Sequence, residues 1–174
     1  MRYLKATAQD ISGNGRADTV ILHFYQKHPD GPDELMDEML AVDVSGNGEI
    51  DLQWTQDGSS TLDKHQLKTF AEAVLKLGWF NRAGYWTRSL NVFVAHYAKT
   101  TRPNAVTLAF HACDPATRRA SMIYKAAAYD GDGDGVLESF TNSDVDHNGI
   151  ANNADKELIR AIGTSFLSMN WHQA

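Results

Sequence analysis

The sequence lacks most features that would place a chain in a membrane, in a disulfide-stabilised scaffold or on a nucleic acid. Cys113 is the only cysteine among 174 residues, which excludes an intramolecular disulfide. No run of about 18 apolar residues occurs, and residues 1–5 do not begin a signal peptide. The 22 acidic residues outnumber the 16 basic ones, giving a net charge of −6. We therefore expect a soluble, acidic protein with no nucleic-acid or membrane partner.

Length and composition fall in the ordinary globular range. The sequence is 43% hydrophobic and 22% charged, so wholesale disorder is not expected. A chain of 174 residues predicts a single domain with a sizeable core. An alternative organisation within that domain is two lobes, formed by residues 1–80 and 81–174.

Four short segments repeat one pattern of oxygen-bearing residues. They are DISGNGRAD (10–18, loop one), DVSGNGEID (43–51, loop two), DGDGDGVLE (130–138, loop three) and DVDHNGIAN (144–152, loop four). Each begins with Asp, has an oxygen-bearing side chain at positions 3, 5 and 9, and has Gly at position 6. This self-similarity is the strongest functional pattern in the sequence.

The repeated pattern is typical of a calcium site. Calcium takes about six to eight oxygen ligands, and a tight loop delivers them from alternate positions, with position 7 contributing its backbone carbonyl. Glycine at position 6 permits the sharp turn. The candidate ligands are Asp10, Ser12, Asn14, Arg16, Asp18, Asp43, Ser45, Asn47, Glu49, Asp51, Asp130, Asp132, Asp134, Val136, Glu138, Asp144, Asp146, Asn148, Ile150 and Asn152, with Asp155 at position 12 of loop four.

A metal-free interpretation of these loops competes with the calcium interpretation. Asp and Asn in glycine-rich segments also form Asx turns and helix N-caps. Four copies of one spacing favour cation binding over that alternative. Loops three and four carry more carboxylates than loops one and two, which use Ser and Asn at positions 3 and 5. We therefore expect loops three and four to bind calcium more tightly.

Residues 34–54, ELMDEMLAVDVSGNGEIDLQW, resemble an EF-hand, with an entering helix followed by a calcium loop. Ile50 matches the apolar residue that the family has at position 8. Residues 130–155 are also similar to the tandem acidic loops of thrombospondin type 3 domains and dockerins. The resemblance implies calcium as the bound ion. The EF-hand family has Glu at position 12, where this chain has Ile21, Trp54, Thr141 and Asp155.

Four helices are predicted from apolar spacing and capping residues. The first begins at Pro32, the second after Ser60, the third after Asp114 and the fourth near Asp155. In each case apolar residues recur at helical spacing downstream of the start.

Three further segments predict β-structure because they are rich in β-branched and aromatic residues. Residues 85–98 and 105–113 predict an antiparallel hairpin, with turn residues at 101–104 between them. Residues 19–25 predict another strand. The expected fold is α+β: a compact domain with about four helices, a hairpin and four EF-hand-like loops.

A catalytic site is not predicted. His96 and His111 fall on opposite arms of the expected hairpin, and His111 and Cys113 share a strand face. A Cys–His nucleophilic pair or a zinc site would need a further orienting or ligating group. No CxxC, HExxH or GxSxG motif occurs. A small enzyme with structural calcium and a site near these residues is therefore an alternative rather than the expectation.

The expected function is that of a calcium-binding protein whose ions stabilise the fold and shape a surface for a protein partner. One alternative is a calcium sensor that opens an apolar groove containing Met36 and Met39. Loops with few charges fill at the millimolar calcium found outside cells. That property favours an extracytoplasmic compartment, although the chain shows no signal peptide.

Overall fold

The computed structural model describes residues 1–56, 60–81, 87–96 and 104–173. Within these residues the chain forms an eight-stranded antiparallel sheet and two α-helices. The strands are β1 (Arg2–Gln9), β2 (Thr19–Gln26), β3 (Glu34–Val42), β4 (Leu52–Thr55), β5 (Thr87–Ala95), β6 (Ala105–Cys113), β7 (Ala120–Tyr129) and β8 (Ser139–Phe140). The helices are α1 (Lys64–Lys76) and α2 (Asn153–Ser168), followed by the 3₁₀ turns η1 (Gly78–Asn81) and η2 (Trp171–Gln173), respectively.

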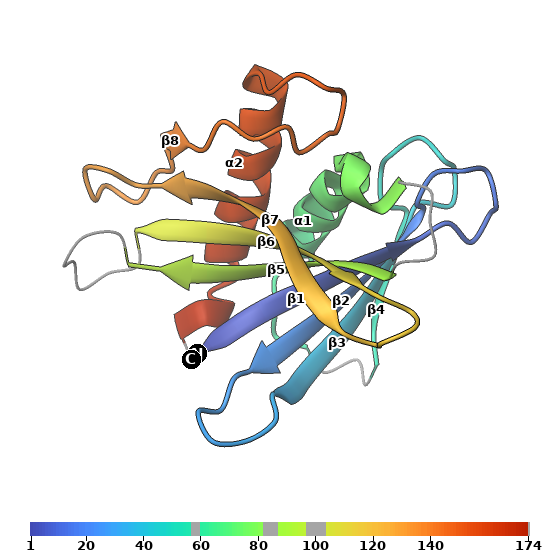
Figure 1. The fold of residues 1–174 in the computed structure, drawn as a ribbon, viewed down its shortest axis with the longest axis horizontal. Helices are drawn as coiled ribbons and strands as arrows, with labels where there is room; N and C mark the ends of the chain where they lie inside the picture. The colour runs from blue at the N-terminus through green and yellow to red at the C-terminus, as the bar shows by residue number, and fades with distance from the viewer. Residues whose placement is uncertain (57–59, 82–86, 97–103, 174) are drawn as a thin grey trace.

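The described elements follow the order ββββα twice. The strand order is β4-β3-β2-β1-β5-β6-β7-β8, so the first strands of the two halves, β1 and β5, pair at the centre of one continuous sheet. Both helices pack on the same face of that sheet, and the two ends of the chain lie side by side (Figure 1). No helix in the described part of the chain has the length and apolarity needed to cross a membrane.

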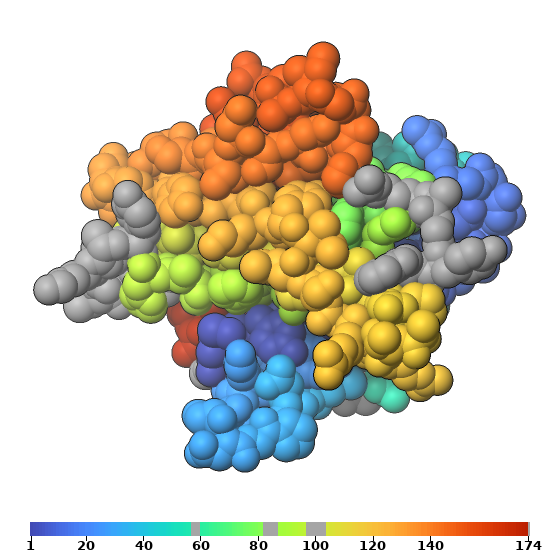
Figure 2. Space-filling view, viewed as in Figure 1, coloured from blue at the N-terminus to red at the C-terminus, as the bar shows by residue number. Residues whose placement is uncertain are grey.

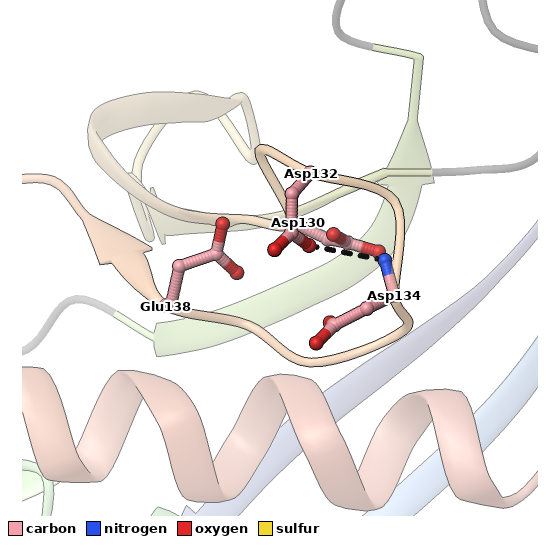
Figure 3. A group of neighbouring side chains, drawn as sticks. All are labelled: Asp130, Asp132, Asp134 and Glu138. Carbon is pink, nitrogen blue, oxygen red and sulfur yellow. Dashed lines mark hydrogen bonds between the residues drawn. The ribbon is translucent and has the colours of Figure 1, made fainter.

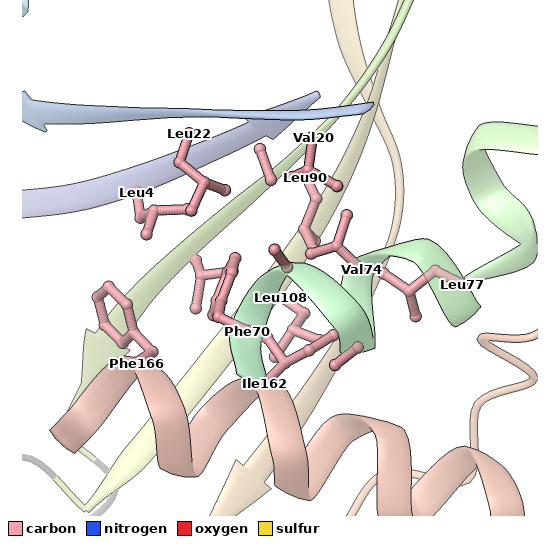
Figure 4. Packing of buried hydrophobic residues seen from close by; sticks show 14 of the residues in the cluster. Leu4, Val20, Leu22, Phe70, Val74, Leu77, Leu90, Leu108, Ile162 and Phe166 are labelled. Carbon is pink, nitrogen blue, oxygen red and sulfur yellow. The ribbon is translucent and has the colours of Figure 1, made fainter. Parts of the chain in front are cut away.

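The core lies between the sheet and the two helices. Alternate residues of the central strands, such as Leu4 and Leu22, point toward the helices and are fully buried. Phe70 of α1 and Phe166 of α2 meet them from the other side (Figure 4). This burial of apolar surface is the main stabilising contribution in the fold.

The predicted α+β fold with about four helices is wrong, because two of those helices are strands and the protein is mostly β. The helix expected after Pro32 is β3, which pairs with β2 on one side and β4 on the other. Met39 and Ala41 are buried, so burial in β3 follows the two-residue period of a strand. Asp114 initiates the β6–β7 turn, accepting the backbone N–H of Ala116 at 2.9 Å.

The other two predicted helices and the predicted strands are confirmed. The N-cap of helix α1 is Asp63, three residues beyond the predicted cap Ser60, and its side chain accepts the N–H groups of His65 and Gln66. Helix α2 has a capping box formed by Asn152 and Asp155. Strand β2 and the antiparallel β5–β6 pair also lie where they were expected. Most of the predicted 101–104 turn lies outside the described residues.

Gly78, just after α1, lies against the backbone of loop four. A Cβ at this position would sit 2.2 Å from the carbonyl oxygen of Asp146. We expect Gly78→Ala to lower the free energy of unfolding by about 1–3 kcal/mol, since a backbone neighbour must move to admit the methyl group. The matched control is Gly31→Ala, where the added Cβ meets no atom within 4 Å. Equal urea-unfolding midpoints for the two variants would contradict this close contact.

Candidate metal centres

The first aspartate of each loop accepts backbone N–H groups from the turn that it begins. In loop one, Asp10 Oδ1 accepts the N–H of Gly13 at 2.7 Å and of Asn14 at 3.1 Å. Its Oδ2 accepts the N–H of Gly15 at 2.7 Å. Asp43 repeats all three bonds in loop two. The backbone therefore wraps around one carboxylate in each loop.

All four loops share an unusual backbone conformation at positions 4 and 6. Position 6 has a positive φ, from 87° at Gly15 to 95° at Gly149, which glycine adopts without steric cost. Position 4 also has a positive φ, and in loop four it is occupied by His147 at 57°. The repeated sequence pattern therefore corresponds to one repeated three-dimensional structure.

The elements that flank the loops differ from those expected by resemblance to the EF-hand. Loops one, two and three each connect two antiparallel strands, and a backbone hydrogen bond closes each connection at its base. In loop one this bond runs from the N–H of Asp18 to the carbonyl of Gln9 at 2.9 Å. Only loop four leads directly into a helix, α2. The entering helix expected before loop two is strand β3.

Loop three brings four carboxylates together. Oxygen atoms of Asp130, Asp132, Asp134 and Glu138 all lie within 4.8 Å of one another (Figure 3). Asp130 is buried, whereas the other three are exposed to solvent. The N–H of Gly131 donates to Glu138 at 2.6 Å and orients that side chain. This group of residues could hold a metal ion.

Loop four forms a second group from Asp144, Asp146 and Asp155, whose oxygen atoms also lie within 4.8 Å of one another. Asp155 is buried at the start of α2 and accepts the N–H groups of Val145 at 2.8 Å and Asn152 at 2.8 Å. Burial raises the pKa of Asp146, and the charges of Asp155 and Asp144 raise it further. A cation would relieve this crowding of negative charge.

Loops one and two use their position-9 carboxylates to hold their own backbone. Asp18 accepts the N–H groups of Ile11 at 3.1 Å and Ser12 at 2.9 Å, and Asp51 binds the matching pair in loop two. Burial opposes ionisation of Asp18, but the bonds from Ser12, Ile11 and Thr19 outweigh it and lower its pKa to about 2.

The low pKa of Asp18 predicts a pH dependence of stability. A depressed pKa stabilises the fold above the unfolded value of 3.8, and this contribution is lost as the pH falls toward about 2. We expect acidification in chelator to lower the free energy of unfolding about 1–2 kcal/mol more in the unmodified protein than in Asp18→Asn. Urea unfolding at several pH values measures the difference. Parallel pH profiles would contradict the assignment.

The predicted ligands are therefore placed unequally. Seven carboxylates are assembled into two groups, one in loop three and one in loop four. At position 7, where the backbone carbonyl is the predicted ligand, the structure exposes the side chains of Arg16, Glu49, Val136 and Ile150. Asn152 caps α2, accepting the N–H of Ala154 at 2.7 Å. Ligation by the remaining residues of loops one and two stays a prediction.

Residues near the end of α1 and in η1 contact three of the four loops. These contacts were not predicted from the sequence. Asn81 accepts the N–H of Ala17 in loop one at 2.8 Å, and Glu72 accepts the N–H of Ile50 in loop two at 3.0 Å. Trp79 stacks on His147 of loop four, with ring centroids 5.9 Å apart. Loop three lies at the other end of the sheet (Figure 1). No sequence pattern identifies these long-range contacts.

The structure does not assemble the alternative histidine site. His111 lies opposite Ser89, whereas His96 follows the far end of β5, so they are roughly 20 Å apart at about 3.3 Å per strand residue. His111 contacts the carbonyl of Ala109 at 3.1 Å, and the Cys113 thiol points toward the carbonyl of Asp114 at 3.9 Å. Neither contact forms a nucleophile–base pair.

No family model matches the chain, and no curated protein or solved structure shows a significant similarity to it.

Proposed function

We propose that the protein binds Ca²⁺ in loops three and four and that the ions stabilise the fold. The observation that supports this most is the convergence of four carboxylates in loop three. Like charges at such separations repel one another, so an arrangement that holds them together favours a cation at its centre. Loop four adds a second group, whose buried member Asp155 belongs to the first turn of α2.

The donor chemistry favours calcium over other common ions. Both groups consist of carboxylates, without His or Cys, which argues against zinc and other ions that prefer nitrogen or sulfur. Magnesium demands a nearly ideal octahedron and retains several waters. Calcium accepts six to eight oxygens in variable geometry, and a loop that also offers a backbone carbonyl can supply most of them.

The positions of the two groups support a structural role for the ions. Loop three joins β7 to the short strand β8, and loop four joins β8 to α2. Figure 2 shows both loops, in orange, at the surface. An ion in each loop would fix the two ends of the connection between the sheet and α2. Binding to the folded state alone would stabilise that state.

Calorimetric titration of the chelator-treated protein with CaCl₂ tests the proposal. We expect at least two binding events, of which one is lost in Asp132→Asn/Asp134→Asn and another in Asp146→Asn. The matched control is Glu157→Gln, an exposed carboxylate of α2 that pairs with Arg160 outside both groups. Absence of calcium binding, or binding that survives all three substitutions in loops three and four, would refute the proposal.

A further inference from the structure

Three Asn–Gly dipeptides occur in the sequence, and all of them occupy positions 5 and 6 of the repeated loops. They are residues 14–15 in loop one, 47–48 in loop two and 148–149 in loop four. All three asparagines are exposed to solvent. Glycine presents no side chain that would hinder attack by its own backbone nitrogen on the preceding amide. These dipeptides are therefore the most reactive Asn sites that the chain offers for deamidation.

The reaction at loop one can be written in full. The backbone nitrogen of Gly15 attacks Cγ of Asn14, a new N–Cγ bond forms, and the bond from Cγ to Nδ2 breaks. The proton from the attacking nitrogen leaves with Nδ2 as ammonia, and a five-membered succinimide ring remains. Water then opens the ring at either carbonyl, which gives aspartate or isoaspartate at the same position. No oxidant or reductant is required.

The fold holds both reacting groups of each dipeptide in other hydrogen bonds. In loop one the N–H of Gly15 donates to Asp10 at 2.7 Å, and Asn14 Oδ1 accepts the N–H of Arg16 at 2.9 Å. Loops two and four repeat both bonds at 2.7–2.9 Å. The side chain must leave its partner and the glycine nitrogen must leave its carboxylate before the ring can close.

We propose that the three Asn–Gly dipeptides are latent deamidation sites, each kept unreactive by the first aspartate of its own loop. These aspartates, Asp10, Asp43 and Asp144, accept the glycine N–H that would otherwise become the nucleophile. This inference goes beyond calcium binding and does not depend on it, because each hydrogen bond that it invokes joins two groups of the chain itself.

Loop three shows what the aspartate product would look like. Asp134 occupies position 5 there and accepts the N–H of Val136 at 2.8 Å, as Asn14 accepts that of Arg16 at 2.9 Å. An aspartate therefore fits the loop and adds one carboxylate to it. Isoaspartate inserts an extra methylene into the backbone, which displaces the glycine from its aspartate. Deamidation would thus give two products: an aspartate that the loop conformation accommodates and an isoaspartate that disrupts it.

The test measures deamidation at each dipeptide by peptide mapping and mass spectrometry after incubation in chelator at mildly alkaline pH. In the native protein we expect all three sites to react roughly ten- to hundredfold more slowly than in urea, the factor that a hydrogen bond to a charged group supplies. Asp10→Ala should accelerate Asn14 by a similar factor and leave the other two dipeptides protected. Asp30→Ala, which removes an exposed aspartate outside the loops, should change none of them.

The other two dipeptides in the same molecule report whether the variant is folded. If Asn14 reacts at an unchanged rate in Asp10→Ala, the aspartate does not control it and the proposal fails. A slower reaction would show that the carboxylate acts as a base and would also overturn the proposal. Equal acceleration of all three sites in each of Asp10→Ala, Asp43→Ala and Asp144→Ala would assign control to global unfolding instead.

Discussion

We expect saturating calcium to raise the midpoint of thermal unfolding of the chelator-treated protein by about 10 °C or more. The expectation follows from linkage, since an ion that binds only the folded state adds roughly 2.7 kcal/mol per site at a hundredfold excess over its dissociation constant. Two sites contribute about 5 kcal/mol, and each kcal/mol shifts the midpoint of a domain of this size by about 2–4 °C. Circular dichroism during heating measures the shift.

Two comparisons make this expectation specific to the carboxylate groups of loops three and four. Magnesium at the same concentration should produce a smaller shift, because it retains its waters and requires a stricter geometry. The variant Asp132→Asn/Asp134→Asn/Asp146→Asn should melt at nearly the same temperature with calcium and with chelator. A calcium shift that persists in this variant would place the stabilising ion elsewhere.

The loops could be predicted from the sequence because their structure is local. Every bond that the first aspartate makes within its loop spans at most five residues, as from Asp10 to Gly15. Position 6 also needs a residue that tolerates a positive φ, and glycine satisfies this in each loop. A nine-residue pattern therefore contains most of the information that determines the turn.

The flanking elements could not be predicted so well because their structure depends on distant partners. Residues 34–42 combine Leu, Met and Glu, which favour helix, yet they form β3 between β2 and β4. Pairing with two neighbours outweighs that weak preference. The same holds for residues 120–129, whose consecutive alanines fit a helix but pair with β6. The EF-hand resemblance strengthened the wrong expectation for the first of these.

Within the candidate site, the long-range contacts that hold the loops could not be predicted from the sequence for the same reason. Asn81 and Ala17 are 64 residues apart, and Glu72 and Ile50 are 22 apart. The role of Asp155 could be predicted in part, since the sequence places this residue at position 12 of loop four. In the structure it also closes the capping box of α2, so one side chain serves both the helix start and the carboxylate group.

Moving one carboxylate at position 5 from loop three to loop one should lower the calcium affinity of loop three and raise that of loop one. Asp134→Asn removes a carboxylate from loop three, and Asn14→Asp adds one to loop one. Both residues accept the position-7 N–H in the same way, at 2.8 Å and 2.9 Å, so the turn itself is conserved in each variant. We expect the affinity of loop three to fall by about tenfold or more, because a unit charge beside a divalent ion contributes at least that at short range.

The same reasoning ranks the position-1 substitutions. Asp130→Ala and Asp144→Ala should weaken calcium binding more than Asp10→Ala, since the first two residues belong to the assembled carboxylate groups and loop one has only two acidic side chains. Asp10→Ala should instead reduce stability by about 1–2 kcal/mol in chelator, through loss of the N–H bonds that it accepts. Site-resolved titration of the four alanine and charge-exchange variants of loops one and three separates charge from geometry. If Asn14→Asp leaves loop one unchanged while Asp10→Ala is the most damaging to binding, loop geometry rather than charge controls affinity.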